Sequence, residues 1–156
     1  MRVVVAGTFG PLHDGHRELF KTALEHGDEG VVVGISSNEF ATETRQPDPR
    51  PIPSYEQRKR QVKAMLNTVD EWNRSIEIRK FTDTYGFASR DPLLDAVVVS
   101  PETDDAVTEL NRRRTERGFD PLESIVVPYE YADDGTPISS TRIVNGEIDE
   151  HGQLLE

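Results

Sequence analysis

The first twenty residues, MRVVVAGTFGPLHDGHRELF, constrain the fold more than any other stretch of this chain. Val3–Val5 is an uninterrupted β-branched run, which is typical of a strand buried on both faces of a parallel sheet. Three glycines and a proline then interrupt regular structure over Gly7–Gly15. Apolar residues return at helical spacing from Leu19. The stretch therefore predicts a strand over Arg2–Ala6, a turn, and a helix over Gly15–His26.

A hydroxyl and two imidazoles fall in this turn, on Thr8, His13 and His16. Open α/β sheets bind ligands at the carboxyl ends of their strands, and helix amino ends attract phosphate. Gly15 lets the backbone at the start of the helix approach a ligand closely. We therefore predict a phosphate site in which His16 donates a hydrogen bond to a phosphate and Thr8 holds a second group opposite it.

The rest of the chain alternates between short apolar runs and helical patterns. Strands are predicted over residues 30–36, 75–80, 95–100 and 124–129, and helices begin at caps on Ser54, Ser100 and Ser139 or Ser140. Five strands that alternate with four helices predict an α/β fold, a single Rossmann-like, doubly wound domain over residues 1–156 with a five-stranded parallel sheet. Residues 147–156 are polar and are expected to fray.

A long polar connection and a helix with a basic face follow the second predicted strand. Residues 38–53 form a long connection whose second half holds four prolines, which exclude a helix there. Arg45 and Arg50 make it a candidate flap that reaches a phosphate, and a solvated loop whose arginines bind nothing is the alternative. In the helix that follows, Arg58 is assigned with its basic neighbours to the solvated face.

Charge and composition limit the partners. The net charge is −11, and it is uneven: residues 1–100 carry 15 acidic and 13 basic side chains, whereas residues 101–156 carry 14 and 5. An acidic protein disfavours long nucleic acid. With no cysteine, no signal peptide and no long apolar run, we expect a cytoplasmic protein without disulfides or a membrane span. Only four basic residues are lysines, which favours a high-salt cytoplasm over an ordinary acidic surface.

The two histidines have other readings. His13 and His16 are spaced i, i+3 and could ligate a metal, but no third ligand of matching softness is evident. His13 could instead be a structural histidine that bonds a backbone carbonyl. A serine-hydrolase role for Ser139 or Ser140 fails because no nucleophile elbow surrounds them.

Two motifs resemble those of a known superfamily. HDGH at residues 13–16, after GTFGPL, matches the HxGH motif of the nucleotidyltransferases. PISSTR at residues 137–142 resembles their second motif, although Arg142 follows Thr141 more closely than usual. Across residues 2–152, segments such as VVVGISSNEFA, VVVSPET and ELNRRRTERGFDPL look like the archaeal-type phosphopantetheine adenylyltransferases.

This resemblance implies a reaction between ATP and 4′-phosphopantetheine, with Mg²⁺ brought in on the ATP phosphates and no metal ligands from the chain. It implies catalytic roles for His16, Thr8 and His13. The residues it implies for ATP are Phe9, Gly15, His16, Ser139, Ser140, Thr141 and Arg142. Those it implies for the acceptor are Thr8, Ser100, Glu102 and, nearby, Thr103. The bacterial enzymes place a phosphate-binding lysine after the second strand; here Arg45, with Arg50 behind it, is the substitute candidate.

Two rival functions stay open on the sequence. Another acceptor, such as flavin mononucleotide or nicotinamide mononucleotide, would use the same motifs. A non-catalytic module that binds nucleotides would keep the fold, but it would not need His16 and Thr8 together.

Overall fold

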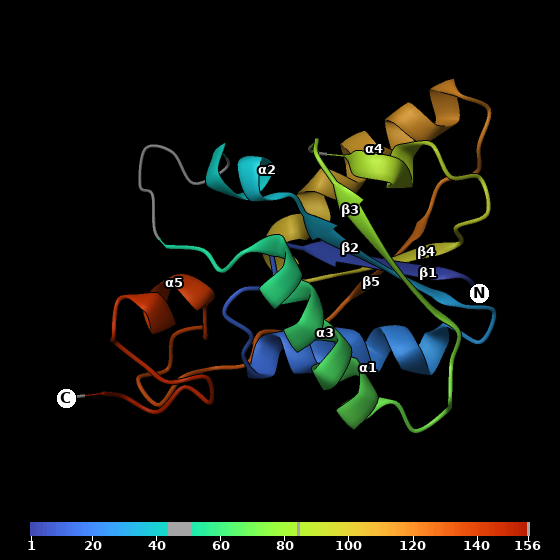
Figure 1. Ribbon diagram of the computed structural model, residues 1–156. Coiled ribbons are helices and arrows are strands. Elements are labelled where there is room, and N and C mark those ends of the chain that lie inside the picture. The colour runs from blue at the N-terminus through green and yellow to red at the C-terminus, as the bar shows by residue number, and fades with distance from the viewer. Residues whose placement is uncertain (44–50, 84, 156) are drawn as a thin grey trace.

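A five-stranded, all-parallel sheet forms the centre of the protein, in a computed structural model that describes residues 1–43, 51–83 and 85–155. The strands follow the order β3-β2-β1-β4-β5 (Figure 1). Their bounds are β1 Val3–Gly7, β2 Val31–Ser36, β3 Ile76–Phe81, β4 Ala96–Val99 and β5 Glu123–Val126. The predicted α/β class and the five-stranded parallel sheet are confirmed, and each strand starts within one residue of its predicted position.

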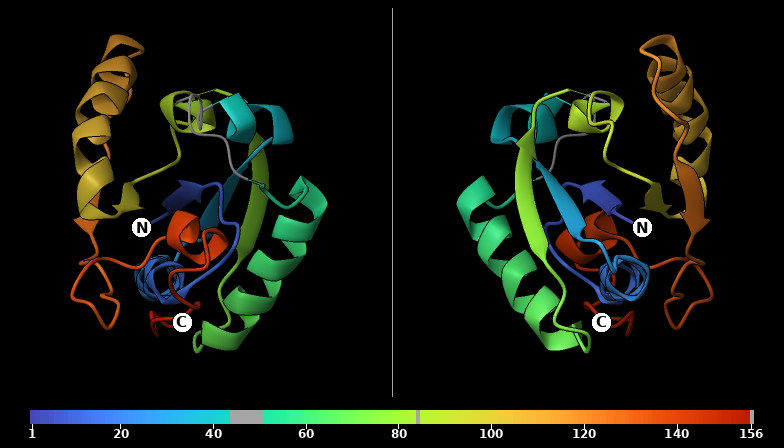
Figure 2. Two further views of the ribbon diagram at one scale, coloured as in Figure 1. Left: turned by 90° about the vertical axis from the view of Figure 1, so that its left-hand side faces the viewer. Right: turned by 90° about the vertical axis from the view of Figure 1, so that its right-hand side faces the viewer.

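Helices cover both faces of this sheet, as Figures 1 and 2 show. One face packs on α1 (Asp14–His26) and α3 (Tyr55–Val69), and the other packs on α4 (Asp104–Glu116). The short elements are α2 (Asn38–Glu43), α5 (Ser140–Val144) and the 3₁₀ turns η1 (Gly86–Ser89) and η2 (Pro101–Thr103). Side chains alternate between the faces, so Val3 and Val5 pack with α1 and α3 while Val4 packs with α4. This is why the valine run has no polar member.

The order of the strands decides where a ligand can bind. The chain passes from β1 outward to β2 and β3, then returns to β4 on the other side of β1. Crossovers on the two sides of β1 therefore cover opposite faces of the sheet, which leaves a crevice between β1 and β4 at their carboxyl ends. Gly7 and Val99 end these two strands, so Thr8 and Ser100 stand side by side at the crevice.

The connection after β2 differs from the predicted long loop. Its first six residues form α2, because the Ser37 hydroxyl accepts a hydrogen bond from the N–H of Phe40 and no proline falls among them. Arg45 and Arg50 lie outside the described residues, so their predicted role at a phosphate stays a prediction.

Arg58 was wrongly assigned to the solvated face of its helix. The side chain is fully buried, on the same stripe of α3 as Tyr55, Val62 and Leu66. Its guanidinium donates to the backbone carbonyl oxygens of Thr8 and Pro53, each at 2.9 Å. The buried arginine is tolerated because it supplies donors to backbone oxygens that would otherwise be buried without hydrogen bonds.

The start of the third predicted helix also differs. Ser100 makes no side-chain cap, and η2 stands between it and α4. The Thr103 hydroxyl instead donates to the Ser100 carbonyl at 2.9 Å. The turn keeps Ser100 and Glu102 at the edge of the sheet rather than inside a helix.

The carboxyl-terminal segment was wrongly expected to fray. Ile148 is fully buried against Ala132 and Ile138, and Ile148 pairs with Leu154 in an antiparallel bridge. The backbone N–H of Asp14 donates to the Glu150 carbonyl at 3.1 Å, which attaches the segment to the start of α1. One buried isoleucine supplies the apolar contact that the polar composition concealed. In the described parts of the chain, no helix is both long and apolar enough to cross a bilayer.

Candidate active site

The turn after β1 is held in shape by Phe9. Its φ of 55° lies in the left-handed region, which a bulky residue adopts only when its surroundings require it. The ring is buried and meets His16 and Phe20 edge to face, with centroids 5.4 and 5.0 Å away. A Cβ on Gly7 would lie 3.0 Å from the Phe9 ring, so a side chain there would require the ring to shift. The aromatic contacts thus fix His16 against the turn.

His13 and His16 cap the amino end of α1 together. His13 Nδ1 accepts from the N–H of Gly15 at 3.0 Å, and His16 Nδ1 accepts from the N–H of His13 at 3.2 Å. A neutral imidazole that accepts at Nδ1 carries its proton on Nε2. Both rings therefore present an Nε2 donor on the side away from the backbone.

Burial keeps His13 neutral. It lowers the pKa of His13 from 6.5 to about 4, an effect that the neighbouring Asp14 charge only partly opposes. The contact to Gly15 is also not the expected bond to a backbone carbonyl, because the imidazole accepts rather than donates there. His13 is thus a helix cap that borders the ligand space as a neutral group.

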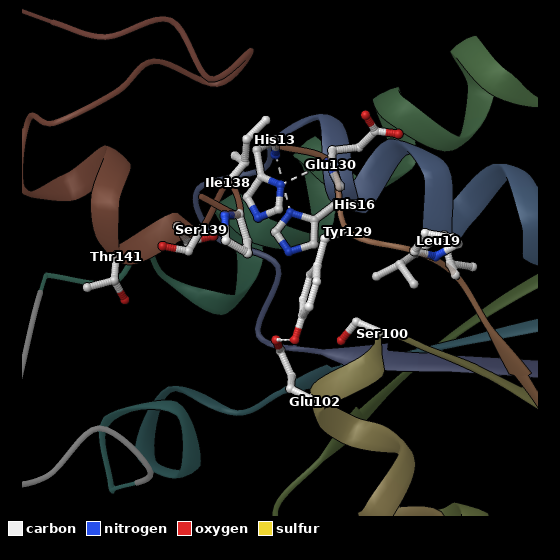
Figure 3. A pocket seen from close by; sticks show the side chains of 15 residues that line it. His13, His16, Leu19, Ser100, Glu102, Tyr129, Glu130, Ile138, Ser139 and Thr141 are labelled. Carbon is white, nitrogen blue, oxygen red and sulfur yellow. Dashed lines mark hydrogen bonds between the residues drawn. The ribbon is translucent and has the colours of Figure 1, made fainter. Parts of the chain in front are cut away.

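A cavity of about 280 Å³ opens beside these rings. His16 lines one wall and Ser100, Glu102 and Tyr129 line another, and Figure 3 shows the two imidazoles facing Tyr129 across the space. The remaining lining residues are His13, Gly15, Leu19, Val127, Pro128, Glu130, Pro137, Ile138, Ser139, Ser140 and Thr141. The cavity therefore joins the two predicted motifs, which lie more than 120 residues apart in the chain.

A second cavity, of about 420 Å³, adjoins the first. The two share His16, Leu19, Ser100 and Glu102. Thr8 lines the second cavity, and much of its wall is apolar, contributed by β1, β4, η1 and α4: Val4, Ala6, Tyr85, Ala88, Val97, Val99, Ala106, Val107 and Leu110. His16 thus lies between a pocket of mixed polar and apolar lining and a more apolar one, and Thr8 lines the latter.

The hydroxyls of the second motif have separate tasks. Ser139 caps α5 by accepting from the N–H of Arg142 at 3.2 Å. The Ser140 hydroxyl donates to the Pro11 carbonyl at 2.6 Å and so ties α5 to the HxGH turn. Thr141 lines the first cavity.

Arg142 lies away from the cavity to which it was predicted to contribute. It does not line either cavity, and its guanidinium pairs with Asp134 and donates to the Pro137 carbonyl. The Arg142 charge and the Thr136 hydroxyl lower the pKa of Asp134 to about 2. Arg142 therefore braces the turn before α5, and its predicted contact with ATP stays a prediction.

Glu102 and Tyr129 connect the ends of β4 and β5 across the cavity mouth. The Tyr129 hydroxyl donates to the Glu102 carboxylate, and this bond raises the pKa of the phenol. Figure 3 shows both side chains meeting beside Ser100. The predicted ligand residues Ser100 and Glu102 are thus in the wall, and Thr103 lines the second cavity.

Comparison with known proteins places these features in a family. The sequence profile described as cytidylyltransferase-like matches residues 4–146. The chain belongs to the cytidylyltransferase-like family. Similar archaeal proteins named phosphopantetheine adenylyltransferase include one from Methanopyrus kandleri, 41% identical over 96% of this chain and 91% of that protein. Another, from Methanosarcina acetivorans, is 39% identical over 98% of this chain and 95% of that protein.

A solved structure agrees with this placement. A protein of unknown function from Archaeoglobus fulgidus superimposes with a TM-score of 0.69 at 29% identity, over 81% of this chain and 89% of that one. The fold of this cytidylyltransferase-like chain therefore recurs in a solved structure.

The cytidylyltransferase-like site contains residues that the sequence did not single out. Tyr129 and Glu130 follow β5, and the rule that ligands bind beyond the carboxyl ends of strands could have found them. Ser36 and Arg58 contact the Thr8 turn from β2 and α3, and no local motif marks them. Among the described residues no group of three or more His, Cys, Asp or Glu is placed to hold a metal ion.

Proposed function

We propose that this chain transfers the adenylyl group of ATP to 4′-phosphopantetheine, forming 3′-dephospho-coenzyme A and pyrophosphate. The observation that carries this proposal is that His16 lies where a cavity of mixed polar and apolar lining adjoins a more apolar one, which Thr8 lines. The shared name of the archaeal relatives, which match nearly the whole chain, supports the choice of substrates.

The reaction requires two polyanions to be brought into line. An oxygen of the acceptor phosphate forms a bond to the α-phosphorus of ATP, and the bond from that phosphorus to the bridging oxygen of pyrophosphate breaks. The attacking phosphate is already anionic, so no general base is needed. Positioning and charge stabilisation supply the catalysis.

His16 and Thr8 are the groups suited to this task. The His16 imidazole, oriented by its Nδ1 contact to the backbone, would donate from Nε2 to the α-phosphate oxygens as charge builds on them. The Thr8 hydroxyl would orient the acceptor phosphate from the adjoining cavity. His13, held neutral by burial, would support the stacked His16 ring rather than bring a charge.

The nucleotide side would occupy the first cavity. Gly15 would offer backbone, and Ser139, Ser140 and Thr141 would border the triphosphate. Phe9, which lines the adjoining cavity, would offer its backbone from there. Mg²⁺ would be brought in on the ATP phosphates, because it keeps several waters and binds in part through substrate phosphates. When bound, it would neutralise triphosphate charge and favour departure of pyrophosphate. Arg45 remains the candidate to grip the acceptor phosphate.

The second cavity supports a pantetheine arm as acceptor. The arm is a narrow chain of methylenes and amides, and the apolar slot between η1 and α4 could bury it while the phosphate stays near Thr8. The shared name of the archaeal relatives is why phosphopantetheine is preferred over flavin mononucleotide.

The experiment is pyrophosphate release from ATP and Mg²⁺ in the presence of three acceptors tested in parallel: 4′-phosphopantetheine, flavin mononucleotide and nicotinamide mononucleotide. We expect turnover with phosphopantetheine alone. Turnover with a different acceptor would overturn the choice of substrate, and silence with all three would overturn adenylyl transfer to these acceptors.

A further inference from the structure

The Thr8 hydroxyl accepts a hydrogen bond from the hydroxyl of Ser36. Ser36, the last residue of β2, donates from Oγ to Thr8 Oγ1 at 3.1 Å. Ser36 is almost fully buried, whereas Thr8 is half-buried and lines the cavity. Within the described part of the chain this is the one hydrogen bond to the Thr8 hydroxyl oxygen.

Ser36 is in turn held by Arg58. The Arg58 Nη1 atom donates to Ser36 Oγ at 3.3 Å and to the Thr8 carbonyl at 2.9 Å. The same guanidinium donates to Asn38 Oδ1 at 3.2 Å. A single buried cation therefore joins the ends of β1 and β2 to the starts of α2 and α3.

The direction of these bonds has a chemical consequence. An arginine can only donate, so the Ser36 oxygen acts as acceptor toward Arg58 and its own proton is directed to Thr8. Thr8 then uses a lone pair for Ser36 and keeps its hydroxyl proton for another acceptor. Hydrogen bonds in such a chain polarise one another, which makes the last hydroxyl a better donor.

We propose that Ser36 and Arg58 are positioning residues which orient the Thr8 hydroxyl as a donor toward the phosphate of the acceptor substrate. This inference rests on the proposed function for the identity of that phosphate. Neither residue touches the substrate; each acts through Thr8. A hydroxyl that donates suits an acceptor phosphate, whose oxygens carry only lone pairs.

The decisive measurement is a double-mutant cycle between Ser36→Ala and Thr8→Val, read as kcat/KM for 4′-phosphopantetheine. We expect each single variant to lose about 5- to 20-fold, which spans the upper end for a neutral hydrogen bond and the lower end for one to a charged group. In the Thr8→Val background we expect Ser36→Ala to cost less than about twofold, because its effect passes through Thr8. The dissociation constant for ATP should change by less than twofold in all three proteins.

Ser89→Ala is the matched control. Ser89 is also a buried serine, but its hydroxyl donates to the Gly86 carbonyl and does not contact Thr8. We expect its kcat/KM to stay within twofold of the unmodified protein. Should Ser36→Ala fail to fold, Ser36→Cys retains a weak donor of similar size, and we expect it to show a smaller loss than Thr8→Val.

The possible outcomes separate this inference from the proposed function. Additive losses in the cycle, or equal losses for Ser36→Ala and Ser89→Ala, would overturn the positioning role while leaving the reaction intact. If the unmodified protein turns over none of the three acceptors, the proposed function fails. The positioning role of Ser36 is then tested by calorimetry with inorganic phosphate. Weaker phosphate binding by Ser36→Ala but not by Ser89→Ala would support this role, and unchanged binding would overturn it.

Discussion

The imidazole rings of His13 and His16 stack on each other, with centroids 3.9 Å apart and planes inclined by 27°. His13 Nδ1 accepts a hydrogen bond from the N–H of Gly15, and His16 Nδ1 accepts one from the N–H of His13. The two imidazoles therefore have two roles: they cap the start of α1, and they line the cavity. Substitutions of His16 and His13 should separate the two roles.

Replacement of His16 should remove chemistry more than binding. We expect His16→Ala to lower kcat for adenylyl transfer by about 10²-fold or more, because a donor that meets developing charge acts mainly in the transition state. The dissociation constant for ATP, measured by calorimetry, should change by only a few fold. Unchanged turnover would refute the role assigned to His16.

His13 should make the fold sensitive to mild acid. Its pKa is about 4 in the folded protein against 6.5 for the free group, so the unfolded chain takes up this proton first as the pH falls. Stability from this residue is complete above pH 6.5 and declines between pH 6.5 and 4, by at most about 2 kcal/mol at pH 5. His13→Asn keeps a helix cap without the titration.

Urea unfolding at pH 7 and pH 5 tests this expectation. The unmodified protein should lose more free energy of unfolding between the two values than His13→Asn does. An equal loss in both proteins would mean that burial does not control the protonation of His13.

Removal of the Arg58 guanidinium should destabilise the protein. Arg58→Met leaves the carbonyls of Thr8 and Pro53 without their donors, and we expect a loss of about 2–4 kcal/mol in unfolding free energy. Arg60→Met, at an exposed position two residues along α3, should change it by less than about 0.5 kcal/mol. Denaturant unfolding compares the two, and similar small effects would contradict the buried role.

The carboxyl-terminal segment should contribute measurably to stability. Ile148→Ala removes a fully buried side chain from the small cluster it forms with Ala132 and Ile138, and we expect a loss of about 2–4 kcal/mol. Leu154 in the same segment is 52% exposed, so Leu154→Ala should cost less than about 1 kcal/mol. If both variants unfold like the unmodified protein, the segment does not pack in solution.

Salt should stabilise the fold. The chain carries a net charge of −11, and its mutual repulsion is screened as ionic strength rises. We expect the Tm to increase from low to molar KCl in a thermal melt. A Tm that falls over this range would count against the inference of a high-salt cytoplasm.

Local sequence patterns determined the sheet and the turn that begins the site. Strands and turns depend on residues that are close in the chain, such as the run Val31–Val33 and the glycines around His13. They can therefore be predicted without a structure. The motif at residues 137–142 could be identified for the same reason, and the structure places it against the HxGH turn, through Ser140 and Pro11.

Only the tertiary structure decided which side chains meet across distant segments. Arg58 looked like a surface residue because its acceptors come from Thr8 and Ser36, far away in the sequence. The contacts of Arg142 with Asp134 and a backbone carbonyl were likewise not marked by any local pattern. Ile148 looked like part of a frayed tail, yet it is buried. Burial and charge pairing are properties of three-dimensional neighbours, and the short-range patterns that mark strands and turns carry no record of those neighbours.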